Sequence, residues 1–172
     1  MRLCHLFRHV DDHSHYLRNF IFGVEDSLVS TVGLLAGVAA AAISQSAIIT
    51  TGLVLIVVEG FSMGVGSFLT EETTEEMEGG KPQTWGAIRG GAVMLVSYCL
   101  AGLIPLAPYA FLLGNTAVVT SVTLSLVGLL ILGYGTSQVY HRPHPFHHAY
   151  KMFVLGGSAV LVGMLVGKLF QV

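Results

Sequence analysis

The sequence has 172 residues, of which 53% are hydrophobic and only 10% are charged, with 21 glycines and a formal net charge of −2. A soluble domain of this length would carry about 25% charged residues. Low charge and abundant glycine therefore indicate a membrane protein with several spans, because small residues let helices approach closely in lipid. No basic patch is dense enough for nucleic-acid binding. Cys4 and Cys99 form neither a disulfide framework nor a CxxC metal site.

Five apolar stretches follow a polar N-terminal segment of residues 1–18, and each is near the roughly 20 residues that a bilayer span requires. They cover residues 20–43, 47–69, 90–113, 117–139 and 152–170. Short connections join them, including an acidic loop over residues 71–85. We therefore expect an all-α membrane protein in which residues 19–172 form one five-span domain.

Basic residues fall almost entirely on one side of the expected membrane. With five spans, the N-terminus and the second and fourth loops share a side. That side collects Arg2, Arg8, Arg18, Lys81, Arg89, Arg142 and Lys151, and the other side has only Lys168. Because cytoplasmic loops carry an excess of Lys and Arg, we expect a cytoplasmic N-terminus and an external C-terminus.

Two acidic residues stand inside the apolar spans. Asp26 lies about six residues, roughly 9 Å, from the cytoplasmic end of the first span, and Glu59 interrupts the second. A charged side chain at the centre of a span costs roughly 2.5–3.5 kcal/mol on insertion scales, so each acid is a functional-site candidate. Glu59, Met63 and Gly66 also share one helical face. A carboxylate beside a thioether suits a divalent transition metal better than Mg²⁺ or Ca²⁺, which take oxygen ligands alone. We expect Asp26, Glu59 and Met63 to line a metal path.

Small residues continue these two faces at helical spacing. Two such stripes facing each other, one on each of the first two spans, would form a small-residue seam with the carboxylates inside it. The glycines that we expect to pack helices, here and in the last span, are Gly33, Gly37, Gly64, Gly66, Gly163 and Gly167.

The segment after the second span reads EETTEEME over residues 71–78. If the second helix continues through it, like charges stack at i,i+4 near a helix C-terminus, where the dipole also disfavours anions. This pattern favours cation attraction at the cytoplasmic entrance, and a solubilising acidic turn is the open alternative. Secondary path or entrance positions are then Glu25, Ser30, Ser62, Glu71, Glu72, Glu75, Glu76, Met77 and Glu78.

Several motifs carry a family resemblance. Residues 22–31 (FGVEDSLVST) with 33–39 (GLLAGVA), residues 62–69 (SMGVGSFL) and residues 102–108 (GLIPLAP) resemble signatures of the first three spans of the vacuolar iron transporter family, and residues 152–170 resemble its last span. The resemblance implies a five-span homodimeric transporter domain that exchanges Fe²⁺ or Mn²⁺ for protons, with Asp26 and Met63 on the translocation path. Glu59 matches a position that is commonly acidic or small. The chain departs from the pattern at Ser27, usually glycine, and at residues 67–68, usually an acid and tyrosine. Its second loop is also too short for the family's large cytoplasmic metal-binding domain.

Together these features favour a transporter that moves Fe²⁺ out of the cytoplasm in exchange for protons. The alternatives are a Mn²⁺ transporter of the same fold, or a membrane-embedded metal-binding protein or oxidase without transport. An oxidase would need bridging carboxylates and histidines on facing helices. We expect no prosthetic group and no enzymatic activity. The expected partners are lipid, a second copy of the chain, the metal and protons. The host membrane would be the cell membrane in a prokaryote or the vacuolar membrane in a eukaryote.

Protease protection tests the predicted orientation. A tag fused after the last residue should be removed by protease added outside intact cells, because the basic residues hold the N-terminal side in the cytoplasm. A tag fused before the first residue should survive until the cells are lysed. The opposite pattern would show that the orientation is inverted.

Overall fold

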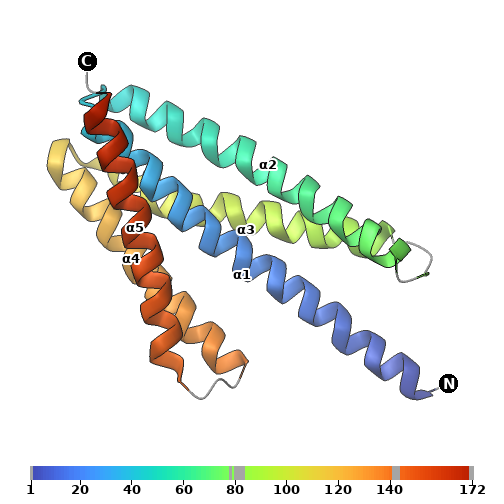
Figure 1. The fold of residues 1–172 in the computed structure, drawn as a ribbon. Coiled ribbons are helices and arrows are strands. Elements are labelled where there is room, and N and C mark those ends of the chain that lie inside the picture. Colours follow the sequence, from blue (N-terminus) through green and yellow to red (C-terminus); the bar gives the residue numbers. More distant parts are fainter. Residues whose placement is uncertain (1, 78, 80–83, 141–143, 171–172) are drawn as a thin grey trace.

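The computed structural model describes residues 2–77, 79, 84–140 and 144–170, with side chains from His15 onward. Over these residues the chain forms five α-helices (Figure 1). They are α1 (Arg2–Ala40), α2 (Gln45–Met77), α3 (Thr84–Phe111), α4 (Gly114–Val139) and α5 (Pro145–Leu169). All five are long and apolar enough to cross a membrane. The expectation of an all-α, five-span protein is confirmed in this respect.

All five helices begin before the spans expected from hydropathy, and α1 and α2 extend furthest beyond them. α1 includes nearly all of the polar N-terminal segment, and α2 continues through residues 71–77 of the segment expected to be an acidic loop. Within that extension the hydroxyl groups of Thr73 and Thr74 donate to the carbonyl oxygens of Leu69 and Thr70, one turn earlier, at 2.8 and 2.7 Å. The segment contains neither glycine nor proline before Gly79, whose φ of +75° suits a residue beyond a helix end. Like charges therefore raise the energy of this helical turn without breaking it.

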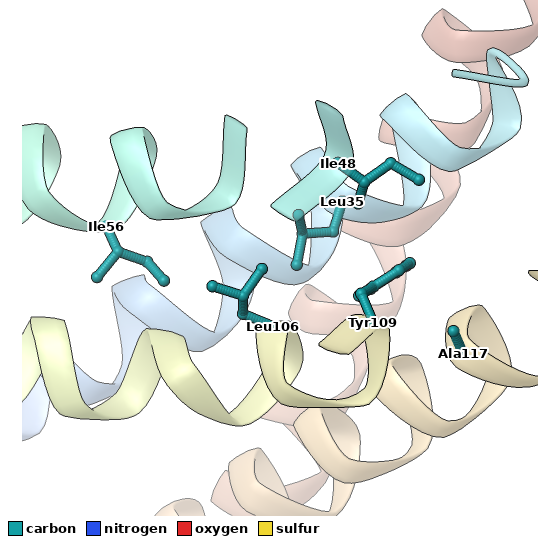
Figure 2. Packing of buried hydrophobic residues seen from close by; sticks show 6 residues of the cluster. All are labelled: Leu35, Ile48, Ile56, Leu106, Tyr109 and Ala117. Carbon is teal, nitrogen blue, oxygen red and sulfur yellow. The ribbon is translucent and has the colours of Figure 1, made fainter. Parts of the chain in front are cut away.

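α1 is the central helix of the bundle and carries several of its fully buried side chains. Leu28, Val32 and Leu35 are at most 1% exposed, and they belong to three different hydrophobic clusters. One cluster joins four helices (Figure 2): Leu35 of α1, Ile48 and Ile56 of α2, Leu106 and Tyr109 of α3, and Ala117 of α4. Polar residues on α1 are consequently held against several neighbouring helices.

Paired glycines bring α1 and α5 into backbone contact. A Cβ atom added to Gly163 would lie 2.0 Å from the carbonyl oxygen of Gly33, and one added to Gly167 would lie 2.0 Å from that of Gly37. Each helix therefore presents two glycines four residues apart, a spacing that permits close crossing in membranes. Gly33 and Gly37 thus face α5 and not α2, which differs from the expected seam between the first two spans.

The glycines of α2 instead bring this helix against α3. A Cβ atom added to Gly64 would lie 3.0 Å from the carbonyl oxygen of Gly91, and one added to Gly60 would lie 2.9 Å from the sulfur of Cys99. Gly66 differs, because nothing lies within 4 Å of a Cβ atom added there. A periodic glycine stripe shows that a helix can be approached closely, but it does not identify the helix that approaches.

α3 remains helical through Pro105 and Pro108, although each proline removes a backbone donor, and side chains of other helices bind carbonyl groups toward its C-terminal end. The hydroxyl group of Ser121 donates to the carbonyl oxygen of Pro105 at 2.6 Å. The amide of Gln45, at the start of α2, donates to the carbonyl oxygens of Tyr109 at 2.5 Å and Leu112 at 3.1 Å. These bonds satisfy acceptors near the end of α3 and tie it to α2 and α4.

Substitution of one glycine in α5 tests the backbone contact. Gly163→Ala should destabilise the purified protein by about 1–3 kcal/mol, because the methyl group has no room beside α1. The measurement is the midpoint of thermal unfolding in detergent. Gly157→Ala is the matched control in the same helix, since nothing lies within 4 Å of a Cβ atom there. Equal midpoints for the two variants would contradict the close crossing of α1 and α5.

Candidate functional site

The two acids within apolar helices lie near each other in the folded chain. Asp26 of α1 and Glu59 of α2 are both half-buried, and their carboxyl groups are close enough to act on each other electrostatically. Glu25, next to Asp26, is also half-buried and acted on by its neighbour. The fold therefore gathers acidic groups from two helices into one region of low polarity.

Glu59 is held by a tyrosine from a third helix. The phenol of Tyr98, on α3, donates a hydrogen bond to the Oε2 atom of Glu59. The same phenolic oxygen lies 2.7 Å from the hydroxyl oxygen of Ser30 on α1. The hydroxyl group of Ser27, one turn earlier on α1, donates to the backbone carbonyl oxygen of Tyr98 at 2.7 Å. Tyr98 is fully buried, so it connects three helices at the level of the acids.

Two cavities lie along α1 and α2, and they differ in their lining. The first, which we call the glycine cavity, has a volume of about 640 Å³; its lining includes Ser30, Gly33, Gly37, Glu59, Gly163 and Gly167. The second, the methionine cavity, has a volume of about 600 Å³; its lining includes Asn19, Phe22, Ser62, Met63, Gly66 and Met94. Along α1, Asp26 falls between the residues of the two cavities. Asp26 therefore lies between a space lined partly by thioethers and a space lined by glycines, serine and larger apolar side chains.

The predicted site residues divide between these spaces. Glu59 and Ser30 line the glycine cavity, and Met63, Ser62 and Gly66 line the methionine cavity. Met63 thus lies one turn after Glu59 on α2. It lines a cavity with Asn19 and Phe22, which precede Asp26 on α1. The structure brings Asp26 toward Glu59 and places Met63 on the side of the N-terminal half of α1.

The acidic end of α2 lies farther along the same helix. Glu76 and Met77 are exposed, whereas Glu72 and Glu75 are half-buried; Glu78 lies outside the described residues. Glu71 lies against α3 and α1, because a Cβ atom added to Gly90 would be 2.5 Å from its Oε2 atom and 2.9 Å from the amide nitrogen of Asn19. The side chain of Glu71 is therefore packed against α3 and does not extend freely into the surroundings.

Sequence reasoning missed two residues that the structure brings to this region. Tyr98 interrupts an apolar run of α3, where a single aromatic residue is more often a packing residue. Met94 lies one turn earlier and lines the same cavity as Met63. The four-residue spacing of Met94 and Tyr98 is the signal that could have found them, because it puts both on one face of α3.

The geometry offers carboxylate oxygens, hydroxyl groups and thioethers, which together are ligands for a borderline divalent metal. Among the residues that the structure describes, no three His, Cys, Asp or Glu side chains form a group that could hold a metal ion.

Comparison with known proteins agrees with the motifs in the sequence. The model of the VIT family matches residues 17–85 and 77–168. The two segments meet at the connection between α2 and α3, where the chain was expected to lack the family's additional domain. The resemblance inferred from the span motifs is thus confirmed.

Curated relatives align with most of the chain. Vacuolar iron transporter 1 of Eucalyptus grandis is 26% identical over 216 aligned positions, covering 90% of this chain and 86% of the relative. Vacuolar iron transporter 1 of Arabidopsis thaliana is 23% identical and covers 96% and 92%. The vacuolar iron transporter of Toxoplasma gondii is 23% identical and covers 97% and 78%. The chain is therefore a multi-pass integral membrane protein, and it belongs to the VIT family.

Proposed function

We propose that this protein is a transporter that moves Fe²⁺ out of the cytoplasm in exchange for protons. The observation that carries the proposal is the pair of carboxyl groups, Asp26 and Glu59, that two apolar helices bring within electrostatic reach of each other. A bare cation cannot cross hydrocarbon, so its path must replace water with ligands, and buried acids are costly unless they have such a role. The names of the aligned relatives support iron as the metal.

The two cavities suggest how an ion reaches and leaves these acids. Met63 and Ser62 line the methionine cavity, on the side that the basic residues assign to the cytoplasm. Glu59 and Ser30 line the glycine cavity, toward the α1–α2 turn. In the proposed path a metal ion passes the thioether of Met63, binds at Asp26 and Glu59, and leaves through the glycine cavity.

A second copy of the chain would complete the ligand set. Asp26 and Glu59 together offer too few donors to enclose a dehydrated ion, and a two-fold axis would double them. The outward face of α2 supports this arrangement. Ser62, Gly66 and Thr70 are exposed there, although polar and small residues at membrane depth are typical of helix–helix contacts. We propose a homodimer with α1 and α2 beside the axis.

Proton exchange follows from the same carboxyl groups. A carboxylate must be deprotonated to ligate a metal, so metal binding releases protons and protonation releases metal. Neighbouring acids titrate as a coupled set, which lets one site alternate between the two cations. Mn²⁺ would be accepted by the same oxygen and sulfur atoms, so flux of both metals must be measured.

Three substitutions test the core of the proposed path. Asp26→Asn removes a charge and keeps the shape, and it should abolish Fe²⁺ flux in proteoliposomes. Glu59→Gln should lower flux at least tenfold or uncouple it from the proton gradient, because a charge-assisted ligand is lost. Met63→Leu keeps volume and removes only sulfur, so it should reduce Fe²⁺ flux more than any leak of Mg²⁺ or Ca²⁺.

The controls for these variants are insertion and assembly. Light scattering corrected for detergent should give two chains per particle for the wild type and for each variant, because a neutral amide is no harder to bury than a carboxylate. If the Asp26→Asn variant transports Fe²⁺ as fast as the wild type at the same amount of protein in the liposomes, the proposed site is wrong. A monomer at high concentration would rule out the dimer.

The acidic end of α2 should increase the apparent affinity of the transporter for cytoplasmic Fe²⁺. Replacing Glu72, Glu75 and Glu76 by Gln should raise the KM for cytoplasmic Fe²⁺ severalfold and leave maximal flux nearly unchanged, because these groups attract cations without binding them in the path. The effect should fade at high salt, since the Debye length is about 8 Å at physiological ionic strength. A collapse of flux at saturating Fe²⁺ would instead make this segment part of the path.

A further inference from the structure

We propose that Tyr98 is a positioning residue for metal transport: it holds the Glu59 carboxylate in one orientation, and Ser27 and Ser30 hold Tyr98 at both ends. This inference rests on the proposed function, because it assigns a role to a residue beside the proposed metal ligand. It is drawn from the connection of α1, α2 and α3 through a single fully buried side chain.

The direction of the hydrogen bonds follows from counting protons. The phenol of Tyr98 has a single proton, and it donates this proton to the Oε2 atom of Glu59. The phenolic oxygen then accepts from Ser30, at 2.7 Å. The bonds therefore run in one sense from α1 to α3 to α2, and in such a chain each bond strengthens the next.

This arrangement leaves half of the carboxylate for a cation. The Oε2 atom of Glu59 is bound by Tyr98, whereas its Oε1 atom has no such restraint from the tyrosine. Glu59 lines the glycine cavity, so a metal can approach a carboxylate whose orientation is already fixed. A free glutamate would lose rotamer freedom on binding the ion, and Tyr98 removes most of that cost beforehand.

Glycines on two helices make the position of Tyr98 possible. A Cβ atom added to Gly60, next to Glu59, would lie 3.3 Å from the Cδ1 atom of the Tyr98 ring. One added to Gly102 would lie 2.9 Å from the hydroxyl oxygen of Ser27, which donates to the carbonyl oxygen of Tyr98. Ser27 thus fixes the backbone of Tyr98, and Ser30 fixes its far end.

A second buried tyrosine on α3 provides the matched control. Tyr109 is 2% exposed, and the tyrosine that donates to Glu59 is Tyr98 and not Tyr109. It does not line either of the two cavities along α1 and α2. Replacing either tyrosine by phenylalanine removes one buried oxygen from the same helix, but only Tyr98→Phe releases Glu59.

The test is Fe²⁺ flux into proteoliposomes that contain the full chain. Tyr98→Phe should raise the KM for Fe²⁺ about tenfold, the usual effect of losing a hydrogen bond to a charged group, with maximal flux within twofold of the wild type. Tyr109→Phe should match the wild type in both constants. Ser30→Ala should raise the KM about threefold. The double variant Ser30→Ala/Tyr98→Phe should equal Tyr98→Phe, because Ser30 acts through the tyrosine.

Other outcomes have distinct meanings. Equal KM values for Tyr98→Phe and Tyr109→Phe, or a loss of maximal flux at unchanged KM, would overturn the positioning role. If Tyr98→Phe fails to fold, the Ser30→Ala variant provides the test, and a KM for Fe²⁺ equal to that of the wild type overturns the inference. Absence of Fe²⁺ flux in the wild type would defeat the proposed function instead. The same variants would then be ranked by equilibrium Fe²⁺ binding in detergent, where an identical affinity for all of them overturns the inference.

Discussion

Short hydrogen bonds between α1, α2 and α3 require helix backbones to come close enough for single side chains to cross from one to the next. Glycine supplies that closeness: Gly60 leaves space for the ring of Tyr98, and Gly102 leaves space for the hydroxyl group of Ser27. A methyl group at either position would meet these side chains at contact distance or less. The hydrogen bonds that join α1, α2 and α3 therefore depend on the absence of side chains at Gly60 and Gly102.

Close approach also explains how an acid can be kept within the membrane. A carboxylate in hydrocarbon is stabilised only if donors satisfy it, and Tyr98 is one such donor for Glu59. At the same time α5 packs on α1 through Gly163 and Gly167, and these two glycines line the same cavity as Glu59. The close crossing of α1 and α5 therefore shapes the space next to this acid.

The sequence predicted the helices and the acids because both produce local signals. Long apolar runs define the spans, and Asp26 and Glu59 interrupt them with residues that lipid does not tolerate. The partners of the glycines could not be predicted, because Gly33 and Gly37 would look the same whether α2 or α5 faced them. Tyr98 was missed for a related reason: an aromatic residue in an apolar run resembles a packing residue until the fold brings Glu59 to its hydroxyl group. The continuation of α2 to Met77 could not be predicted firmly, because two features of the sequence conflict. Repulsion between the glutamates disfavours a helix there, whereas the lack of glycine and proline before Gly79 permits one.

The most direct measurement of the central claim is the position of the metal itself. Crystals or vitrified particles of the protein, prepared anaerobically with Fe²⁺, would locate the ion, and anomalous scattering at the iron edge would identify it in crystals. The account predicts a peak between two copies of the chain, within coordination distance of the carboxyl groups of Asp26 and Glu59. A peak confined to the acidic end of α2, with none at these two carboxylates, would contradict it.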